Sequence, residues 1–178
     1  MKLLFVIFTL MFMPLLNLAQ AKTFIVFVDM EKIINISKPG ASVLKQLNKL
    51  NKANMIKFKK IEETLKEKEK KLSAQKNILS SAEFQNTFSK LKLEVEKYNK
   101  DRSKTINEFK KIQFDNKVKL IELINPILAD YSNKNSIDVI LKKESVLVAK
   151  TELDITDLII VDVNKKLKEF KIKWTIII

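Results

Sequence analysis

The chain contains neither cysteine nor histidine among its 178 residues, and it has a single glycine. Without cysteine an exported protein has no disulfide to rely on and no thiol to misoxidise. Histidine is the commonest general base and metal ligand, so its absence removes the most familiar catalytic and metal-binding sites. One glycine, Gly40, cannot build a phosphate-binding loop of the P-loop or dinucleotide type. We therefore expect no enzyme, no cofactor and no bound metal.

Positive charge is abundant and is concentrated in one region. The chain has a formal net charge of +13. Residues 45–119 hold 21 lysines and arginines, of which only Arg102 is arginine, against 10 aspartates and glutamates, a difference of +11. Codon bias can raise the lysine content of a whole chain, but it does not gather the charge in one segment. Such a segment suits an acidic partner. The competing interpretation is a coiled coil with a solvated face.

The first residues have the pattern of a secretory signal peptide. Lys2 precedes an apolar run over residues 3–16, and an Ala-x-Ala exit ends at Ala21. The run is shorter than the roughly 20 residues that a bilayer span needs. We expect cleavage between Ala21 and Lys22 and a soluble mature chain, and an uncleaved membrane anchor is the alternative.

The mature chain opens with a predicted strand and a short helix. Residues 23–28 form an unbroken β-branched and aromatic run, which predicts a strand buried on both faces. Asp29 suits the N-cap of a helix over residues 30–36, and the helix dipole favours an anion such as Glu31 in its first turn. The adjacent breakers Pro39 and Gly40 predict a turn.

Two long amphipathic helices follow, over residues 41–77 and from Ser81 to about residue 133. Ser80 and Glu83 form a capping box between them, which predicts one reversal and an antiparallel hairpin. At 1.5 Å per residue the helices would be about 55–75 Å long, the second being the longer. Polar residues interrupt the heptads and weaken the seam. The seam positions are Leu44, Leu47, Phe58, Ile61, Leu65, Leu72 and Leu79, facing Phe84, Phe88, Leu91, Val95, Tyr98, Ile106 and Phe109.

Beyond about residue 118 the second helix becomes apolar on most of its circumference, which indicates that it enters a core. Pro126 should kink it there. Two strands are predicted next, over residues 137–141 and 145–150, joined by residues 142–144 as a hairpin loop.

A final helix is predicted to begin after Asp154 as N-cap, with Asp157 in its first turn. Its buried face would consist of Ile155, Leu158, Ile159, Leu167 and Phe170.

This order of elements resembles the Skp/OmpH family of periplasmic chaperones over essentially the whole mature chain. The most specific stretches are Phe24–Met30, Ile137–Leu141 and Asp154–Thr156. None of them is a catalytic motif, so together they indicate architecture. The chain departs from the family in an apolar tail over residues 173–178, for which three placements are open: packed on the body, capping the trimer, or exposed.

The resemblance implies an α+β, predominantly helical fold. Residues 22–42 and 118–178 would form a small β-containing body that trimerises, and residues 43–117 would form the projecting arm. The short strands of three subunits would join, through Phe24, Val26, Val28, Ile137, Val139, Leu141, Val146 and Val148.

The resemblance also implies an ATP-independent periplasmic holdase that keeps unfolded outer-membrane β-barrel proteins from aggregating in a basic cavity. We expect the client-binding residues on the arm to be Lys59, Lys60, Lys66, Lys70, Lys90, Lys97, Arg102 and Lys104. Aromatic residues could also contact a client, but the spacing favours seam positions for most of Phe58, Phe84, Phe88, Tyr98, Phe109 and Phe114.

Two other classes of function stay open. One is an exported structural coiled coil that acts as an envelope scaffold without a client. The other is a binder of anionic envelope lipid such as lipopolysaccharide, which could coexist with chaperoning because both use a cationic surface. Nucleic acid is not expected as a partner, because recognition of bases normally uses several arginines or interleaved stacking aromatics, and the chain has one arginine.

Overall fold

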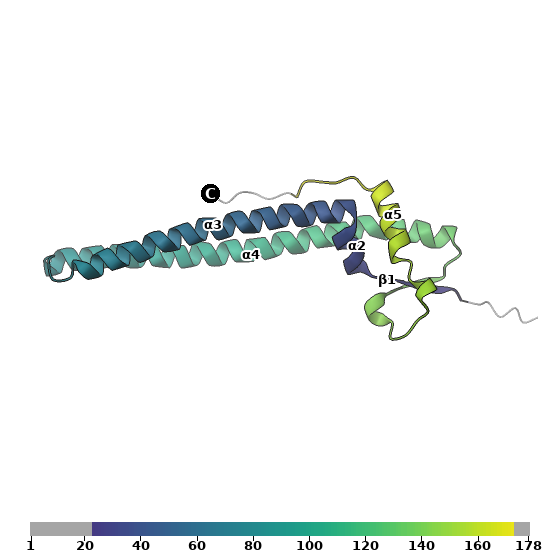
Figure 1. Cartoon of the computed structure of the whole chain (residues 1–178), viewed down its shortest axis with the longest axis horizontal. Coiled ribbons are helices and arrows are strands. Elements are labelled where there is room, and N and C mark those ends of the chain that lie inside the picture. Colours follow the sequence, from purple (N-terminus) through teal and green to yellow (C-terminus); the bar gives the residue numbers. More distant parts are fainter. Residues whose placement is uncertain (1–22, 173–178) are drawn as a thin grey trace, which may run out of the picture.

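The computed structural model describes residues 23–172, so the predicted signal peptide, its cleavage site at Ala21 and Lys22, and the tail from Lys173 onward lie outside the described residues. The chain forms a small body from which a long two-helix arm projects (Figure 1). No helix within residues 23–172 is long and apolar enough to cross a bilayer.

The body contains a two-stranded parallel sheet. β1 (Ile25–Val28) pairs with β2 (Val139–Lys142), with Val26 opposite Ile140. The other edge of β1 makes a single bridge, between Phe27 and Asp154. Residues 29–138, most of which are helical, therefore separate two strands that are neighbours in space.

The predicted hairpin after β2 is wrong. Lys143–Ser145 form a 3-10 turn, η1, and residues 146–150 hold no regular structure. Leu147 and Val148 are 98% and 88% exposed there. Strand propensity expresses how well side chains pack on a neighbouring pleated surface, and within residues 23–172 this segment pairs with no strand.

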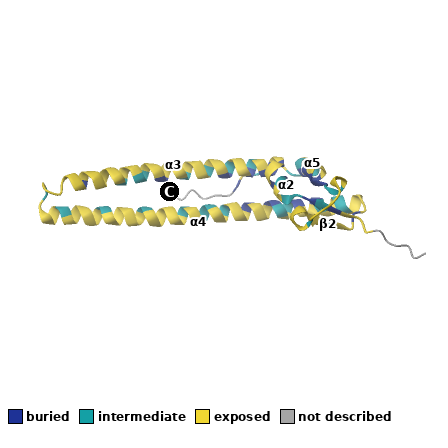
Figure 2. Cartoon of the chain, turned by 60° about the horizontal axis from the view of Figure 1, so that its bottom comes forward, coloured by how far each residue is buried: buried dark blue, intermediate teal, exposed yellow. Residues whose placement is uncertain are grey.

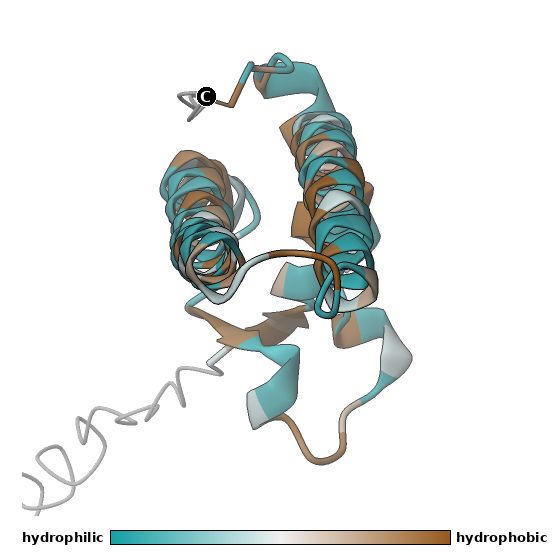
Figure 3. Cartoon of the chain, turned by 90° about the vertical axis from the view of Figure 1, so that its left-hand side faces the viewer, coloured by the Kyte–Doolittle hydropathy of each residue, from teal (hydrophilic) through white to brown (hydrophobic). Residues whose placement is uncertain are grey.

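β1 is also buried on one face only, not on both as predicted. Val26 and Val28 are almost completely buried, whereas on the opposite face Ile25 is 42% exposed and Phe27 is half-buried. The reason is that the helices cover one face of the sheet (Figure 3), whereas Ile25, Val139 and Leu141 on the other face stay 37–42% exposed.

The first two helices begin at the N-caps Asp29 and Ser37, of which only Asp29 caps with its side chain. Asp29 caps α2 (Met30–Ile36), because its Oδ1 accepts from the backbone N–H of Lys32 at 2.8 Å. The turn predicted at Pro39 and Gly40 is replaced by a single extended residue, Ser37, after which α3 (Lys38–Ala74) begins. Proline is tolerated in a first helical turn, where its missing N–H would have no helical partner.

The arm is an antiparallel pair of helices joined by a short turn. The capping box is confirmed: the hydroxyl of Ser80 accepts from the N–H of Glu83, whose carboxylate accepts from the N–H of Ser80. α4 (Ser81–Lys134) has 54 residues and α3 has 37, so the second helix is the longer, as predicted; α4 continues as one helix through Pro126. These lengths correspond to about 55 and 80 Å.

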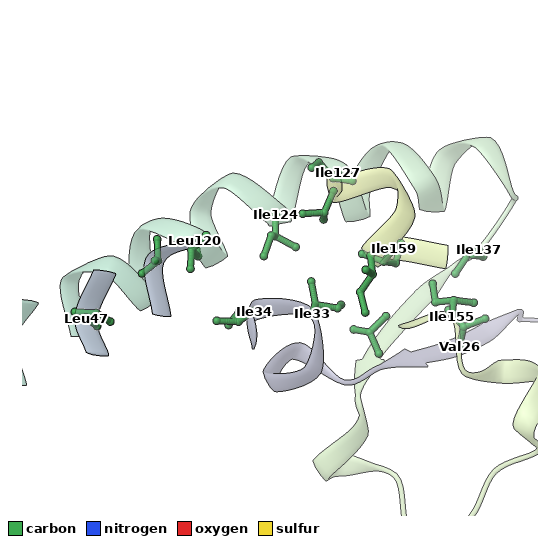
Figure 4. Packing of buried hydrophobic residues seen from close by; sticks show 14 of the residues in the cluster. Val26, Ile33, Ile34, Leu47, Leu120, Ile124, Ile127, Ile137, Ile155 and Ile159 are labelled. Carbon is green, nitrogen blue, oxygen red and sulfur yellow. The ribbon is translucent and has the colours of Figure 1, made fainter. Parts of the chain in front are cut away.

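The core lies where α2, the arm's base, the sheet and α5 (Thr156–Lys166) meet. Its most buried side chains include Ile33, Leu120, Ile124 and Ile159 (Figure 4). Two details of the α5 prediction are wrong. Leu158 is 54% exposed, and Asp154 lies one residue before the N-cap position, which Ile155 takes.

After α5 the chain runs back over the base of the arm as an extended segment. We call this segment, Leu167–Ile172, the strap. The amide of Gln46 on α3 donates to the carbonyl oxygen of Phe170 at 3.0 Å and accepts from the N–H of Ile172 at 3.1 Å. Ile172 is 5% exposed and belongs to the core cluster. The predicted buried positions Leu167 and Phe170 thus pack on the core from the strap and not from a helix.

Candidate functional site: the grooves of the arm

The arm presents mostly exposed residues along both helices (Figure 2). A narrow seam holds the helices together. The ring of Phe58 meets that of Tyr98 edge-on at 5.9 Å, and Lys68 forms an ion pair across the helices with Glu94 at 2.5 Å. Because the polar seam positions leave gaps between such contacts, side chains of the two helices line open grooves.

Two grooves share one face of the arm, which we call the open face. The distal groove, of about 750 Å³, lies toward the tip, and the proximal groove, of about 450 Å³, lies toward the body. Glu62 and Tyr98 line both, so the grooves meet end to end. A third groove, of about 360 Å³, is lined by Lys57, Ile61 and other residues, and we call it the strap-side groove.

The open face combines exposed apolar side chains with positive charge. Phe88, Val95 and Ile106 are 48%, 38% and 45% exposed and line these grooves. Together the two linings hold six cations, among them Lys59, Lys66 and Arg102, against three glutamates, a net charge of +3. The excess lies in the proximal groove, because the distal lining holds three lysines and three glutamates. An apolar floor with a basic rim suits an extended chain that carries both apolar and acidic side chains.

One rim glutamate is already neutralised. The side chain of Lys66 lies 2.7 Å from Glu62, one turn away, and this hydrogen bond and charge hold the pKa of the Glu62 carboxyl below its usual range. The same contact raises the pKa of Lys66. Glu62 therefore stays ionised at neutral pH and offsets one of the cations of the open face.

The structure separates the eight predicted client-binding residues into three groups. Lys59, Lys66 and Arg102 line the open-face grooves, and Lys97 and Lys104 line the strap-side groove. Lys60, Lys70 and Lys90 line none of these three grooves. Their role in binding stays a prediction.

Most of the aromatic residues lie in the seam, as expected from their spacing. Phe58 is 9% exposed, whereas Phe88 and Phe114 are 48% and 67% exposed and do not belong to the seam. Phe88 stacks on Phe84 one turn before it, with ring centroids 6.4 Å apart. Sequence reasoning missed Met55, which is 66% exposed and lines the proximal groove, because it lies outside the heptad positions of the seam.

The predicted trimerisation residues occupy two environments. Val26, Val28 and Ile137 are buried in the core of their own chain, so they support the sheet from beneath. The residues that remain available at the surface are Phe24, Val139, Leu141 and Val148, with Val146 half-buried.

Two of the specific sequence stretches meet at a buried polar network. The hydroxyl of Thr156, which is 1% exposed, accepts from the backbone N–H of Asp29 at 2.9 Å and donates to the carboxylate of Asp154. Asp154 also accepts from the N–H of Thr156 at 3.0 Å. The network joins β1 and α2 to the start of α5, and so fixes the outer face of the sheet relative to the arm.

Within residues 23–172, no three side chains of aspartate, glutamate, histidine or cysteine lie close enough together to hold a metal ion. The features available for function in this part of the chain are surfaces: the grooves of the arm and the outer face of the sheet.

The comparisons with known proteins agree on one family. A crystal structure from Caulobacter crescentus CB15, of a protein assigned as an OmpH-like outer membrane chaperone, shares the fold with a TM-score of 0.77 at 15% identity, over 85% of this chain and 89% of that one. Among curated proteins, none matches the chain. The model of the family described as outer membrane protein (OmpH-like) matches residues 24–163. The chain is therefore a member of the OmpH-like family.

Proposed function

We propose that this protein is a periplasmic, ATP-independent holdase that binds unfolded outer-membrane β-barrel proteins and prevents their aggregation. The observation that carries the proposal is the open face of the arm, where exposed apolar side chains and lysines line two continuous grooves. Membership of the OmpH-like family supports it. The predicted signal peptide supports export.

The chemistry of the open face suits weak and reversible holding. Its apolar side chains are half-exposed and form no enclosed pocket, so each contact with a client buries little surface. The net charge of +11 over residues 45–119 draws an acidic client toward the arm from a distance. Many shallow contacts let the client move and leave, whereas one deep pocket would trap it.

We further propose that three chains assemble through the outer face of the sheet. The register places Ile25 beside Val139 and Phe27 beside Leu141, so these four side chains form one apolar patch. Ile25, Val139 and Leu141 are 37–42% exposed. A sheet of two strands that is covered on one side only buries little apolar surface. Association with other subunits would bury this patch as well. The arms of three subunits would then surround a shared basic cavity.

An aggregation assay tests the holdase proposal. An unfolded outer-membrane barrel protein is diluted from urea with and without this protein, in the absence of nucleotide, while light scattering is recorded. We expect suppression that weakens with salt, because exposed charges are screened over about 10 Å at 0.1 M. Suppression that did not change with salt would refute the proposal that positive charge on the arm contributes to client binding. No suppression at all would favour the envelope scaffold.

Assembly is tested separately by light scattering of the purified protein. We expect about three times the monomer mass at micromolar concentration for wild type, and dissociation for Val139→Asp. Leu158→Asp is the matched control, because Leu158 is also an exposed apolar residue of the body but lies on α5, away from the sheet. A monomeric wild type, or a trimer that tolerates Val139→Asp, would contradict the proposed interface.

A further inference from the structure

The strap is held to the arm by contacts on both helices. The two hydrogen bonds to the Gln46 side chain engage Phe170 and Ile172, which are two residues apart, as a neighbouring strand residue would. The ammonium group of Lys119 on α4 lies 4.9 Å from the centre of the Phe170 ring. Ile172 fills part of the core. The strap therefore already occupies the start of the furrow between α3 and α4.

Helical spacing identifies which groove continues from the strap. Gln46 and Lys57 are 11 residues apart, close to three turns of α3, so they lie on the same side of that helix. Lys119 and Asp101 are 18 residues apart, which is five turns of α4. Lys57 and Asp101 both line the strap-side groove. Figure 3 shows the strap and the sheet on opposite sides of the helix pair.

The next residues of the chain match this groove in length and in composition. Residues 173–178 read Lys-Trp-Thr-Ile-Ile-Ile, a β-branched and aromatic run that favours an extended conformation. Six extended residues span about 20 Å, which corresponds to about 13 residues of helix. Measured from Gln46, that length ends just beyond Lys57 and Phe58. The apolar floor of the strap-side groove, Phe58, Ile61 and Leu65, begins there.

We propose that the strap-side groove is the docking site for this chain's own segment 173–178. The segment continues the strap along the furrow, with its isoleucines at the near end of the apolar floor. It ties the last part of the body to the arm and covers the strap side. Clients are then restricted to the open face. The proposal does not depend on the chaperone function.

The absence of cysteine makes disulfide trapping a direct test. Side chains alternate along an extended chain, so Ile176 lies on the same side as the buried Ile172. It lies four residues after Ile172, about 13 Å in extended chain, and Lys57 lies 11 helical residues after Gln46, about 17 Å, an offset that a disulfide can bridge. The test variant combines Lys57→Cys with Ile176→Cys in the full mature chain. The matched control combines Lys59→Cys with Ile176→Cys, because Lys59 lines the proximal groove on the open face.

We expect the Lys57 pair to oxidise within one chain about tenfold faster than the Lys59 pair, because only side chains a few ångströms apart can form the bond. Peptide mass spectrometry identifies the linkage, and a non-reducing gel separates bonds within a chain from bonds between chains. Equal rates for the two pairs would overturn the proposal. So would cross-linked dimers, which would assign the groove to the segment of a neighbouring subunit.

A second measurement uses the only tryptophan of the chain, Trp174. We expect its fluorescence to be protected from acrylamide in the wild type and to lose that protection in Gln46→Ala, which removes both hydrogen bonds to the strap. Gln75→Ala, at the far end of α3, is the control and should leave quenching unchanged. Quenching of wild-type Trp174 as strong as in the urea-unfolded chain would overturn the docking.

Discussion

The substitution Gly40→Ala tests the packing that orients the arm on the body. Gly40 lies in the first turns of α3, where α2 crosses it. A Cβ atom added there would lie 1.6 Å from the carbonyl oxygen of Ile34 and 2.7 Å from its carbonyl carbon. Both are backbone atoms of α2, so no side-chain rotation relieves the overlap. α2 must move away from α3, together with the buried residues Ile33 and Ile34.

Two effects of the substitution oppose each other. Alanine is the better helix former, and in an exposed helix this change stabilises by about 0.5–1 kcal/mol. Extra atoms forced into a close-packed core typically cost about 1–3 kcal/mol. The overlap here is with backbone, so we expect the upper end of that range and a net loss of about 2 kcal/mol. For a chain of this length that corresponds to a decrease in Tm of roughly 4–8 °C.

Thermal unfolding followed by circular dichroism measures this loss. All variants are compared at one protein concentration, because assembly makes Tm depend on concentration. The control Ala41→Gly, at an exposed neighbouring position, should cost only about 1 kcal/mol through helix propensity. A Gly40→Ala protein as stable as wild type, or more stable, would refute the close approach of α2 and α3.

Three further predictions concern the body and the arm. The hydrogen bond from the Lys32 N–H and the nearby Lys143 ammonium hold the pKa of Asp29 below its usual value of 3.8, so the stability that Asp29 adds is complete above that pH and is lost as the pH falls through the folded-state pKa. Acid titration of Asp29→Asn, which keeps a capping side chain, should therefore show a shallower loss of stability than that of the wild type. Identical profiles for the two proteins would exclude this contribution. Thr156→Val should cost about 1–3 kcal/mol in urea unfolding, because it leaves the backbone N–H of Asp29 without its partner and removes one of two hydrogen bonds to the Asp154 carboxylate; a neutral effect would contradict the network. Phe88→Ser should weaken suppression of client aggregation about tenfold, whereas Leu93→Ser, which is even more exposed on α4 but lies outside the three grooves, should not. Equal effects would show that binding does not follow the open face.

Local features of the fold could be predicted from the sequence because their causes lie within a few residues. The capping box at Ser80 and Glu83 and the N-cap at Asp29 each satisfy backbone groups of the adjacent helix turn. Heptad spacing made the arm predictable as two long helices, since the repeat itself defines the seam. The proline and glycine after Ser37 misled the prediction for a related reason. Their tendency to break a helix is local, whereas the close packing of α2 against the first turn of α3, which Gly40 permits, depends on a neighbouring element.

What only the tertiary structure decided is how distant segments meet. β1 pairs in parallel with β2, a segment more than a hundred residues away in the chain, and the two strands are buried on the side where the helices pack, while Ile25, Val139 and Leu141 stay exposed on the other. The lysines of the arm look alike in sequence, yet Lys59 and Lys97 line grooves on different faces. Composition reports how much charge the arm carries. Which side of the helix pair presents it depends on the rotation of each helix about its axis, and that rotation is determined by packing in the seam and in the body.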